Sequence, residues 1–350
     1  MRLKPEKIVL SPRIPAVSRI AIGSLTVSGM QAALPAEEAA KVISYAFDCG
    51  INFIDTAQYY SNYGIIRQAL DRCKSPDDVV ISTKTYAYSR PLAISAVEEA
   101  RRMLGRDVID IFMLHEQESY ETMKGHMEAY EYLLECREKG IVRTVGASTH
   151  HVSLVKALIR LKGEGIPVDV CHPLYNMKGI GIADGGEEDM AAAASALHGT
   201  GTGIFCMKAL GGGHLCASAE EAFSFVLSKD WVGAVAVGMQ SKEEVRANLR
   251  FFANGSFSRS DRKKLSSKKR TLHVEDYCEG CGNCVRRCGQ KALRLVPRET
   301  DASPSYGDFT ADFEADQPRE RRMIAEADDS LCVRCGYCTS VCPVFALKIY

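Results

Sequence analysis

The chain has 350 residues, of which 46% are apolar and 25% charged, and its 44 acidic residues balance its 44 basic ones. Such a composition is typical of a globular protein, and a chain without net charge is a poor partner for nucleic acid or for an anionic membrane surface. The first residues contain no apolar run of the signal-peptide type, and no later stretch is long and apolar enough to span a bilayer. The sequence therefore predicts a cytoplasmic protein that binds neither nucleic acid nor membrane.

Short apolar, β-branched runs alternate with longer amphipathic stretches from about Arg19 onward. Eight of these runs are expected to form strands, at residues 19–25, 51–57, 78–84, 108–115, 141–148, 168–176, 202–210 and 233–239. Mostly apolar strands that are each followed by a helix indicate a parallel sheet buried on both faces. The fold class is therefore α/β, and eight such units predict a (β/α)8 TIM barrel. An open doubly wound sheet is the alternative, but the turn after the first strand lacks the glycine-rich phosphate-binding pattern.

Four polar residues follow three consecutive predicted strands. Asp55 ends the second strand and Tyr60 lies in the loop after it, whereas Lys84 and His115 end the third and fourth strands. Each residue alone has an ordinary structural explanation, as a helix cap, a packing residue, a solvated strand end or a buried histidine. In a TIM barrel, however, the active site lies at the carboxyl ends of the strands. Four polar residues that converge on this rim therefore favour a catalytic site.

The segments GINFIDTAQYY, ISTK and DIFMLH resemble the signatures of the aldo/keto reductase family, and the resemblance extends from Ser18 to Phe252. It implies an oxidoreductase that interconverts a carbonyl and an alcohol by hydride transfer with NAD(P)H. Matching the motifs gives the catalytic tetrad of the family as Asp55, Tyr60, Lys84 and His115.

The resemblance also implies a role for each member of the tetrad. Tyr60 acts as the general acid and base, and because a free tyrosine has a pKa of about 10, the ammonium group of Lys84 is expected to lower that value. Asp55 pairs with Lys84, and His115 orients the carbonyl oxygen through a hydrogen bond. Tyr59 adjoins Tyr60 in the sequence and remains an alternative proton donor.

A nicotinamide cofactor is expected across the barrel mouth by the same resemblance. Ser148 and His172 stand at the positions that meet its amide, His172 in place of the usual glutamine, and Met207 stands where a side chain packs on the ring. The complete set of expected cofactor-binding residues is Gly23, Ser24, Ser148, His172, Met207, Leu210, Gly211, Gly238, Gln240, Glu244 and Asn248.

The loop after the eighth strand bears on the choice between NADH and NADPH. Glu244 stands where an arginine commonly binds the 2′-phosphate of NADP, and a carboxylate there repels a phosphate. The sequence therefore favours NADH, although Lys242 and Arg246 are close by.

The fourteen cysteines form two groups. Six are scattered through apolar segments and are expected to be core residues. The other eight form two runs with the C-x2-C-x2-C-x3-C spacing of bacterial ferredoxins, in which the fourth cysteine of each run binds the other cluster. One [4Fe–4S] cluster is therefore assigned to Cys278, Cys281, Cys284 and Cys342, and the second to Cys332, Cys335, Cys338 and Cys288. Zinc is the alternative for any CxxC pair, but two complete copies of the spacing favour iron–sulfur clusters.

The expected organisation is a barrel at residues 1–256, a basic linker at 257–272 and a ferredoxin-like α+β domain at 273–350. An acidic, proline-containing insertion is expected between the two cysteine runs, at about 297–330. Aldo/keto reductases with a C-terminal two-cluster domain form a branch of the family, which this chain resembles along nearly its whole length.

Three functions are compatible with this combination. The first is a nicotinamide-dependent oxidoreductase acting on a small carbonyl or alcohol, with the clusters serving electron relay or structure. The second is an electron-transfer oxidoreductase, in which a ferredoxin-like partner feeds the clusters and these feed a barrel-bound substrate or a flavin. No flavin motif is present, although a barrel mouth has room for one. The third is a non-catalytic redox-sensing protein, which the intact tetrad disfavours.

Overall fold

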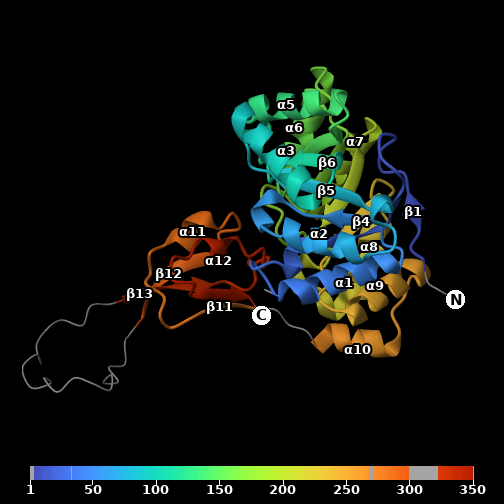
Figure 1. The fold of residues 1–350 in the computed structure, drawn as a ribbon. Helices are drawn as coiled ribbons and strands as arrows, with labels where there is room; N and C mark the ends of the chain where they lie inside the picture. Colours follow the sequence, from blue (N-terminus) through green and yellow to red (C-terminus); the bar gives the residue numbers. More distant parts are fainter. Residues whose placement is uncertain (1–3, 33, 268–270, 299–321, 350) are drawn as a thin grey trace, which may run out of the picture.

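The structure is a computed structural model that describes residues 4–32, 34–267, 271–298 and 322–349, and it consists of a barrel with a smaller domain against one side (Figure 1). Parallel strands close the barrel in the order β10-β3-β4-β5-β6-β7-β8-β9. They are β3 (Ile20–Gly23), β4 (Phe53–Asp55), β5 (Val80–Thr85), β6 (Ile109–Leu114), β7 (Val142–Thr149), β8 (Val170–Pro173), β9 (Gly203–Met207) and β10 (Ala234–Val237). Each of them overlaps one of the eight segments predicted as strands, so the TIM barrel is confirmed and the open sheet is excluded.

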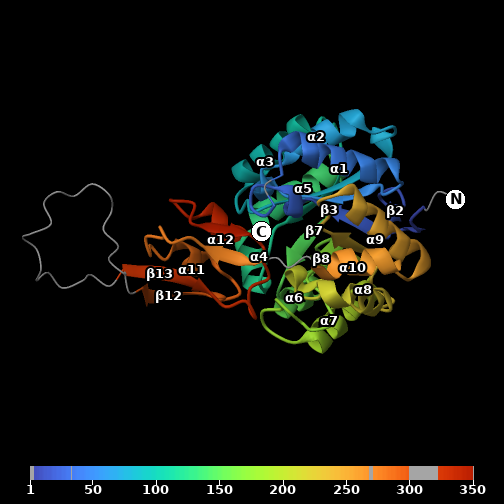
Figure 2. The same ribbon diagram turned by 90° about the horizontal axis from the view of Figure 1, so that it is seen from below.

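Helices surround the strands (Figure 2). They are α1 (Ala36–Asp48), α2 (Tyr63–Arg72), α3 (Arg90–Leu104), α4 (Tyr120–Gly125), α5 (Met127–Glu138), α6 (Val152–Gly163), α7 (Glu187–Gly199), α8 (Ala219–Leu227) and α9 (Lys242–Asn254). The first of them illustrates why they form, because α1 carries Glu37 and Glu38 in its first turn and buries Ala39, Ile43 and Phe47. Acidic residues interact favourably with a helix N-terminus, and one apolar face suffices to hold a helix against a sheet.

The interior of the barrel is closed at its amino end by a hairpin that the sequence pattern did not predict. Its two strands, β1 (Lys7–Ile8) and β2 (Val17–Ser18), pair antiparallel. Leu10, Ile14 and Val17 of the hairpin pack into one apolar cluster with Phe53 and Phe205 from inside the barrel. Strands of two residues are too short to leave a recognisable alternation in the sequence.

The C-terminal domain contains two antiparallel strand pairs and two short helices. These elements are β11 (Leu272–Val274), α11 (Asn283–Arg287), β12 (Leu293–Arg298), β13 (Arg322–Ala327), α12 (Tyr337–Ser340) and β14 (Leu347–Ile349). Strand β11 pairs with β14 and β12 pairs with β13. Its small core combines cysteine side chains with residues such as Leu272, Leu293 and Leu347.

The predicted linker and the predicted insertion both contain regular structure. Helix α10 (Arg259–Ser267) occupies part of the predicted linker, where Arg262 forms an ion pair with Glu220 on α8 at 2.8 Å. The predicted insertion includes residues 299–321, which lie outside the described residues, but β13 on its far side pairs with β12. Among the described residues, no helix is long and apolar enough to cross a membrane.

Gly146 in β7 gives a test of the barrel packing. A Cβ atom at this position would lie 1.8 Å from the carbonyl oxygen of Val170 on β8, whereas nothing lies within 4 Å of a Cβ at Gly125. Gly146→Ala is therefore expected to destabilise the barrel by about 1–3 kcal/mol or more, which lowers the apparent melting temperature by roughly 3–10 °C. The melting temperature of Gly125→Ala, measured under the same anaerobic conditions, should stay within about 2 °C of that of the unaltered chain. Equal melting temperatures for both variants would contradict the packing of β7 against β8.

Candidate functional site

A buried ion pair lies at the carboxyl end of β4 and β5. The ammonium Nζ of Lys84 is 2.7 Å from both carboxylate oxygens of Asp55 and donates a further hydrogen bond to the carbonyl of Thr56 at 2.7 Å. Ser82 donates to Asp55 Oδ1 at 3.0 Å. Only 1% of the Lys84 side chain and 7% of the Asp55 side chain are exposed, so the two charges are paired away from water.

His172 on β8 is a third member of this group. Its Nε2 lies 3.4 Å from Asp55 Oδ2, its Nδ1 lies 2.7 Å from the carbonyl oxygen of Phe205, and its ring stacks on the Phe205 ring at 4.0 Å. Burial raises the pKa of the Asp55 carboxyl, but the charge of Lys84 and the contact with His172 outweigh burial and hold that pKa well below its usual range. Asp55 therefore remains ionised.

Tyr60 lies beside this pair, in the short 3-10 turn Gln58–Tyr60. Its ring centroid is 5.5 Å from Lys84 Nζ and 5.6 Å from the ring of His115. Burial and the negative charge of Asp55 raise the pKa of Tyr60 well above its ordinary value, and a hydrogen bond with Tyr337 partly offsets the rise. This direction is opposite to the expected effect of Lys84, because burial and the charge of Asp55 outweigh the ammonium group. Tyr60 therefore stays protonated, which is the form that a proton donor needs.

His115 follows β6, and its ring lies edge-on against that of Tyr60. Burial lowers the pKa of His115 to about 3, so its imidazole is neutral at ordinary pH. Its ring stacks on Tyr86 at 4.5 Å, and its Nε2 lies 3.2 Å from the hydroxyl of Tyr337. Tyr337 comes from the C-terminal domain and was missed by the sequence analysis. The only signal for it in the sequence is an aromatic residue between two cysteines of a cluster-binding run.

Tyr59, the alternative to Tyr60, points elsewhere. Its hydroxyl lies 2.8 Å from the hydroxyl of Ser340 in the C-terminal domain, and its ring meets the rings of Tyr86 and Tyr337. The geometry therefore groups Asp55, Lys84 and His115 around Tyr60 and places Tyr59 in the contact between the two domains.

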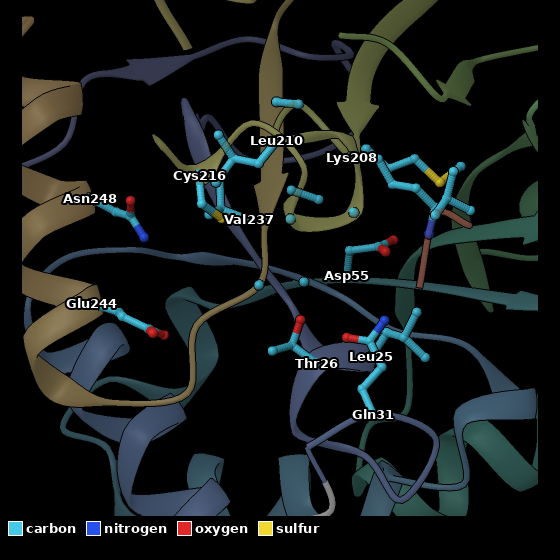
Figure 3. A pocket seen from close by; sticks show the side chains of 18 of the residues that line it. Leu25, Thr26, Gln31, Asp55, Lys208, Leu210, Cys216, Val237, Glu244 and Asn248 are labelled. Atoms are coloured by element: carbon cyan, nitrogen blue, oxygen red, sulfur yellow. The ribbon is translucent and has the colours of Figure 1, made fainter. Parts of the chain in front are cut away.

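A large pocket opens beside Tyr60 and extends to α9, with a volume of about 1140 Å³ that includes its part open to solvent (Figure 3). Asp55 and Lys208 lie toward one end of it, and Glu244 and Asn248 project from α9 at the other. Seven of the expected cofactor-binding residues line it, namely Gly23, His172, Met207, Leu210, Gly238, Glu244 and Asn248. Lining residues that were not expected include Leu25, Thr26, Gln31, Lys208, Cys216 and Val333.

Four other expected cofactor-binding residues, Ser24, Ser148, Gly211 and Gln240, are not among the residues that line this pocket. Ser24 accepts hydrogen bonds from the amide of Asn62, and Ser148 Oγ accepts one from the backbone N–H of Glu116 at 2.9 Å. Gly211 begins the short turn Gly211–Gly213, and the backbone N–H of Gln240 donates to Glu244.

The shape and polarity of this pocket fit an elongated nicotinamide dinucleotide. One end adjoins the tetrad and the other adjoins the first turns of α9. The carbonyl oxygen of the Asn248 side chain is buried and has no hydrogen-bond partner among the described residues, although it belongs to a residue that lines the pocket. Since buried polar atoms are nearly always hydrogen-bonded, this acceptor indicates a place for a ligand donor.

Two smaller cavities in the C-terminal domain are each lined by four cysteines. One, which we call the distal cavity, is lined by Cys278, Cys281, Cys284 and Cys342. The other, the proximal cavity, is lined by Cys288, Cys332, Cys335 and Cys338. Each therefore combines three cysteines of one run with the fourth of the other run, as the ferredoxin spacing predicts. The remaining lining is mostly apolar and includes Leu295 and Leu347 in the distal cavity. Two cubane clusters with thiolate ligands fit this arrangement.

The proximal cavity lies next to the large pocket. Val333 lines both of them, and Tyr337 lines the proximal cavity while packing in one apolar cluster with Tyr60. Cys335, one of the four cysteines of the proximal cavity, packs against the same cluster. The candidate cluster site and the candidate catalytic site are therefore separated by single side chains.

Comparisons with known proteins agree with both parts of the chain. The aldo/keto reductase family matches residues 19–221, and a 4Fe-4S dicluster domain matches residues 277–346. An aldo-keto reductase from Mycolicibacterium paratuberculosis is 29% identical over 150 residues, which are 41% of this chain and 52% of that protein. The methylglyoxal reductase DkgA of Yersinia pestis is 25% identical over 145 residues and covers the same shares. The chain thus spans about half the length of the curated relatives it matches.

A solved structure shares the barrel fold. The Bombyx mori aldo-keto reductase, determined in complex with NADP, superposes with a TM-score of 0.57 at 14% identity and covers 75% of this chain and 92% of its own. The family match, the closed barrel and the ferredoxin-type C-terminus all support one classification. The chain belongs to the aldo/keto reductase family of oxidoreductases and carries a 4Fe–4S dicluster domain at its C-terminus.

Proposed function

We propose that this protein interconverts a small carbonyl compound and its alcohol with a nicotinamide cofactor, and that Tyr60 is the general acid and base. The observation that carries the proposal is the position of Tyr60, which lies beside the buried Asp55–Lys84 pair at one end of a pocket that extends to Asn248. The NADP complex of the Bombyx mori relative supports the cofactor, and the methylglyoxal reductase relative supports a small carbonyl.

Each residue of the tetrad has a distinct task in this chemistry. When bound, the reduced nicotinamide supplies a hydride. Tyr60 donates its proton to the oxygen of the carbonyl, and the raised pKa of Tyr60 keeps that proton in place until the oxygen gains negative charge. Asp55 holds Lys84 so that its Nζ lies 5.5 Å from the Tyr60 ring centroid. The positive charge of this ammonium group stabilises the phenolate that forms when Tyr60 gives up its proton. Neutral His115 packs edge-on against the Tyr60 ring, with the ring centroids 5.6 Å apart.

We further propose that NADH is preferred over NADPH. Glu244 lines the far end of the pocket with its carboxylate. The two basic residues nearby are directed to Tyr45 instead: Lys242 Nζ lies 5.5 Å from its ring centroid, and Arg246 donates to its hydroxyl at 2.8 Å. With these cations directed to Tyr45, the charge of Glu244 lines this end of the pocket, and its carboxylate also accepts a hydrogen bond from the backbone N–H of Gln240. A carboxylate repels a 2′-phosphate, whereas it accepts a hydrogen bond from a ribose hydroxyl.

A second function is favoured by one observation, the wall that Val333 forms between the large pocket and the proximal cavity. A one-electron centre at that cavity would adjoin a substrate or flavin in the pocket. The clusters would then serve as the electron source and Tyr60 as the proton source, without nicotinamide. The two functions are distinguished by variants that lack a cluster cysteine, in which the iron content shows whether a cluster is lost and the turnover shows whether that cluster is needed.

Replacing Tyr60 tests the general acid. Tyr60→Phe is expected to lower kcat by about 10²- to 10⁴-fold, because it removes the proton donor, while the Kd of the nicotinamide stays within a fewfold. Tyr59→Phe is the matched control, since it removes the hydroxyl of the neighbouring tyrosine, which bonds to Ser340. Near-normal turnover in Tyr60→Phe, or a larger loss in Tyr59→Phe, would reject the assignment.

Replacing Glu244 tests the cofactor preference. Glu244→Arg is expected to raise kcat/KM with NADPH relative to NADH by roughly ten- to hundredfold, because a charged hydrogen bond contributes about 1.5–3 kcal/mol. Glu243→Arg is the control on the same turn of α9, where Glu243 forms an exposed ion pair with Arg246 at 3.5 Å. An unchanged ratio in Glu244→Arg, or the same change in both variants, would contradict the role of Glu244.

Removing one cysteine from each cavity tests the number of clusters and their part in turnover. Cys288→Ala and Cys342→Ala are each expected to lower the iron content from about eight to about four atoms per chain, since each removes a ligand from a different cluster. Cys49→Ala, outside both runs, should leave iron unchanged. Turnover with NADH is expected to survive in Cys342→Ala, because the distal cavity shares no lining residue with the large pocket. Its loss in this variant with an intact barrel would favour the second function, whereas Cys288→Ala also removes a ligand from the cavity that Val333 shares with the pocket.

A further inference from the structure

The two cysteine runs share the same left-handed backbone positions. Gly282 of the first run and Gly336 of the second have φ angles of 72° and 82°. Two residues earlier in each run, Gly280 has a φ angle of 64° and Arg334 one of 48°. At this second place the backbone conformation is therefore repeated while the side chain differs, since one run has glycine and the other arginine.

The glycine of the first run is explained by the space around it. A Cβ atom at Gly280 would lie 2.2 Å from the carbonyl oxygen of Met323 on β13. Glycine also adopts a positive φ without steric cost, whereas an arginine does not. Arg334 therefore occupies a strained backbone position at which glycine would be easier to accommodate. A strained residue that is retained in this way indicates a function for its side chain.

The guanidinium group of Arg334 is buried beside the proximal cavity. Only 7% of the side chain is exposed, and Arg334 is one of the residues that line this cavity. Its Nη1 contacts His214 and donates to the carbonyl oxygen of Cys332 at 3.0 Å, and its Nη2 donates to Asp329 Oδ1 at 3.0 Å. The third nitrogen, Nε, is buried and has no hydrogen-bond partner among the described residues. Buried N–H groups are rarely left without an acceptor, so this donor indicates an acceptor in the cavity.

The charges around the two cavities differ in sign. Arg287 and Arg334 line the proximal cavity, whereas Glu279 is the one acidic or basic residue among the described residues that line the distal cavity. Asp329, the carboxylate partner of Arg334, is 61% exposed, so water weakens its field more than that of the buried guanidinium. Positive charge and hydrogen bonds to sulfur make an iron–sulfur cluster easier to reduce, and both are offered at the proximal cavity.

We propose that Arg334 raises the reduction potential of the proximal cluster above that of the distal cluster, through its charge and through an Nε–H donor to sulfur. An electron from a one-electron donor, such as a ferredoxin-like protein or dithionite, then rests at the cavity that shares Val333 with the large pocket. The donor loses one electron, the cluster gains it, and no covalent bond forms or breaks. The inference rests on the two proposed [4Fe–4S] clusters and does not depend on the substrate of the barrel.

The test is a redox titration of the full chain, purified anaerobically with its clusters and followed by the EPR signal of the reduced clusters. The unaltered chain is expected to take up two electrons in two steps of unequal potential. Cys342→Ala, which removes a ligand of the distal cluster, should retain the step at the higher potential. Cys288→Ala, which removes a ligand of the proximal cluster, should retain the step at the lower potential.

Replacing Arg334 should move one of these steps. Arg334→Gln removes the charge and Nε, and is expected to lower the equilibrium constant of the higher step by about tenfold or more, which is about 59 mV for a one-electron couple. The lower step should stay within about threefold. Arg286→Gln is the matched control, because Arg286 donates to the carbonyl oxygen of Cys281 in the first run at 3.3 Å but is exposed. This control should leave both steps within about threefold.

Arg334→Gly is the second variant, since it gives this place the residue of the first run and relieves the backbone strain. It should lower the higher step as Arg334→Gln does. Loss of the proximal cluster from both variants would make Arg334 a structural residue of the cluster site and would refute the proposed effect on the potential.

Other results would also overturn the proposal. They are steps that stay within threefold in Arg334→Gln, an equal shift in Arg286→Gln, and a Cys342→Ala variant that retains the lower step. Failure of the two-cluster assignment is recognised separately, because the unaltered chain would then contain about four iron atoms or fewer.

Discussion

The buried carboxylate of Asp55 needs a neighbouring positive charge and hydrogen-bond donors, and the rest of the site depends on this requirement. Its carboxylate is met by Lys84 from β5 and approached by His172 from β8, while Ser82 supplies another hydrogen bond. Removing one partner of a buried pair leaves an uncompensated charge, which costs several kcal/mol. The strands that carry these residues are consequently tied to one another at the rim, and Tyr60 lies against a surface that has little freedom to move.

The second constraint is the contact between the domains, which brings aromatic rings together around one cation. Arg287, next to a cysteine of the first run, lies 5.5 Å from the ring centroid of Tyr59, 5.8 Å from that of Tyr86 and 4.9 Å from that of Tyr337. A guanidinium held over aromatic faces is favourable, particularly when it is largely withdrawn from water. Both cysteine runs thus contribute side chains to the wall of the barrel mouth. The C-terminal domain therefore contributes to the shape of the barrel mouth next to Tyr60.

Much of this architecture could be predicted because it depends on local patterns. The eight strands follow from apolar runs, and Asp55, Lys84 and His115 follow from the rule that strand ends face the barrel mouth. The exchange of Cys288 and Cys342 between the two cavities follows from the ferredoxin spacing. In contrast, the two-residue strands of the amino-terminal hairpin leave no periodicity to detect. The contacts of Tyr337 with His115 and of His172 with Asp55 join residues far apart in sequence, and these residues meet only through the tertiary packing. The pKa of Tyr60 was expected to fall, but it rises because Tyr60 is buried, and the sequence does not show that burial.

The position of Val333 between the large pocket and the proximal cavity has a consequence for how the protein matures. It is a wall residue of both the large pocket and the proximal cavity, and it stands beside a cysteine expected to hold iron. In a segment of this kind, with one short helix and several cysteines, a bound inorganic core contributes to the shape. The supply of iron and sulfide to a newly made chain thus bears on the geometry of a pocket that binds neither.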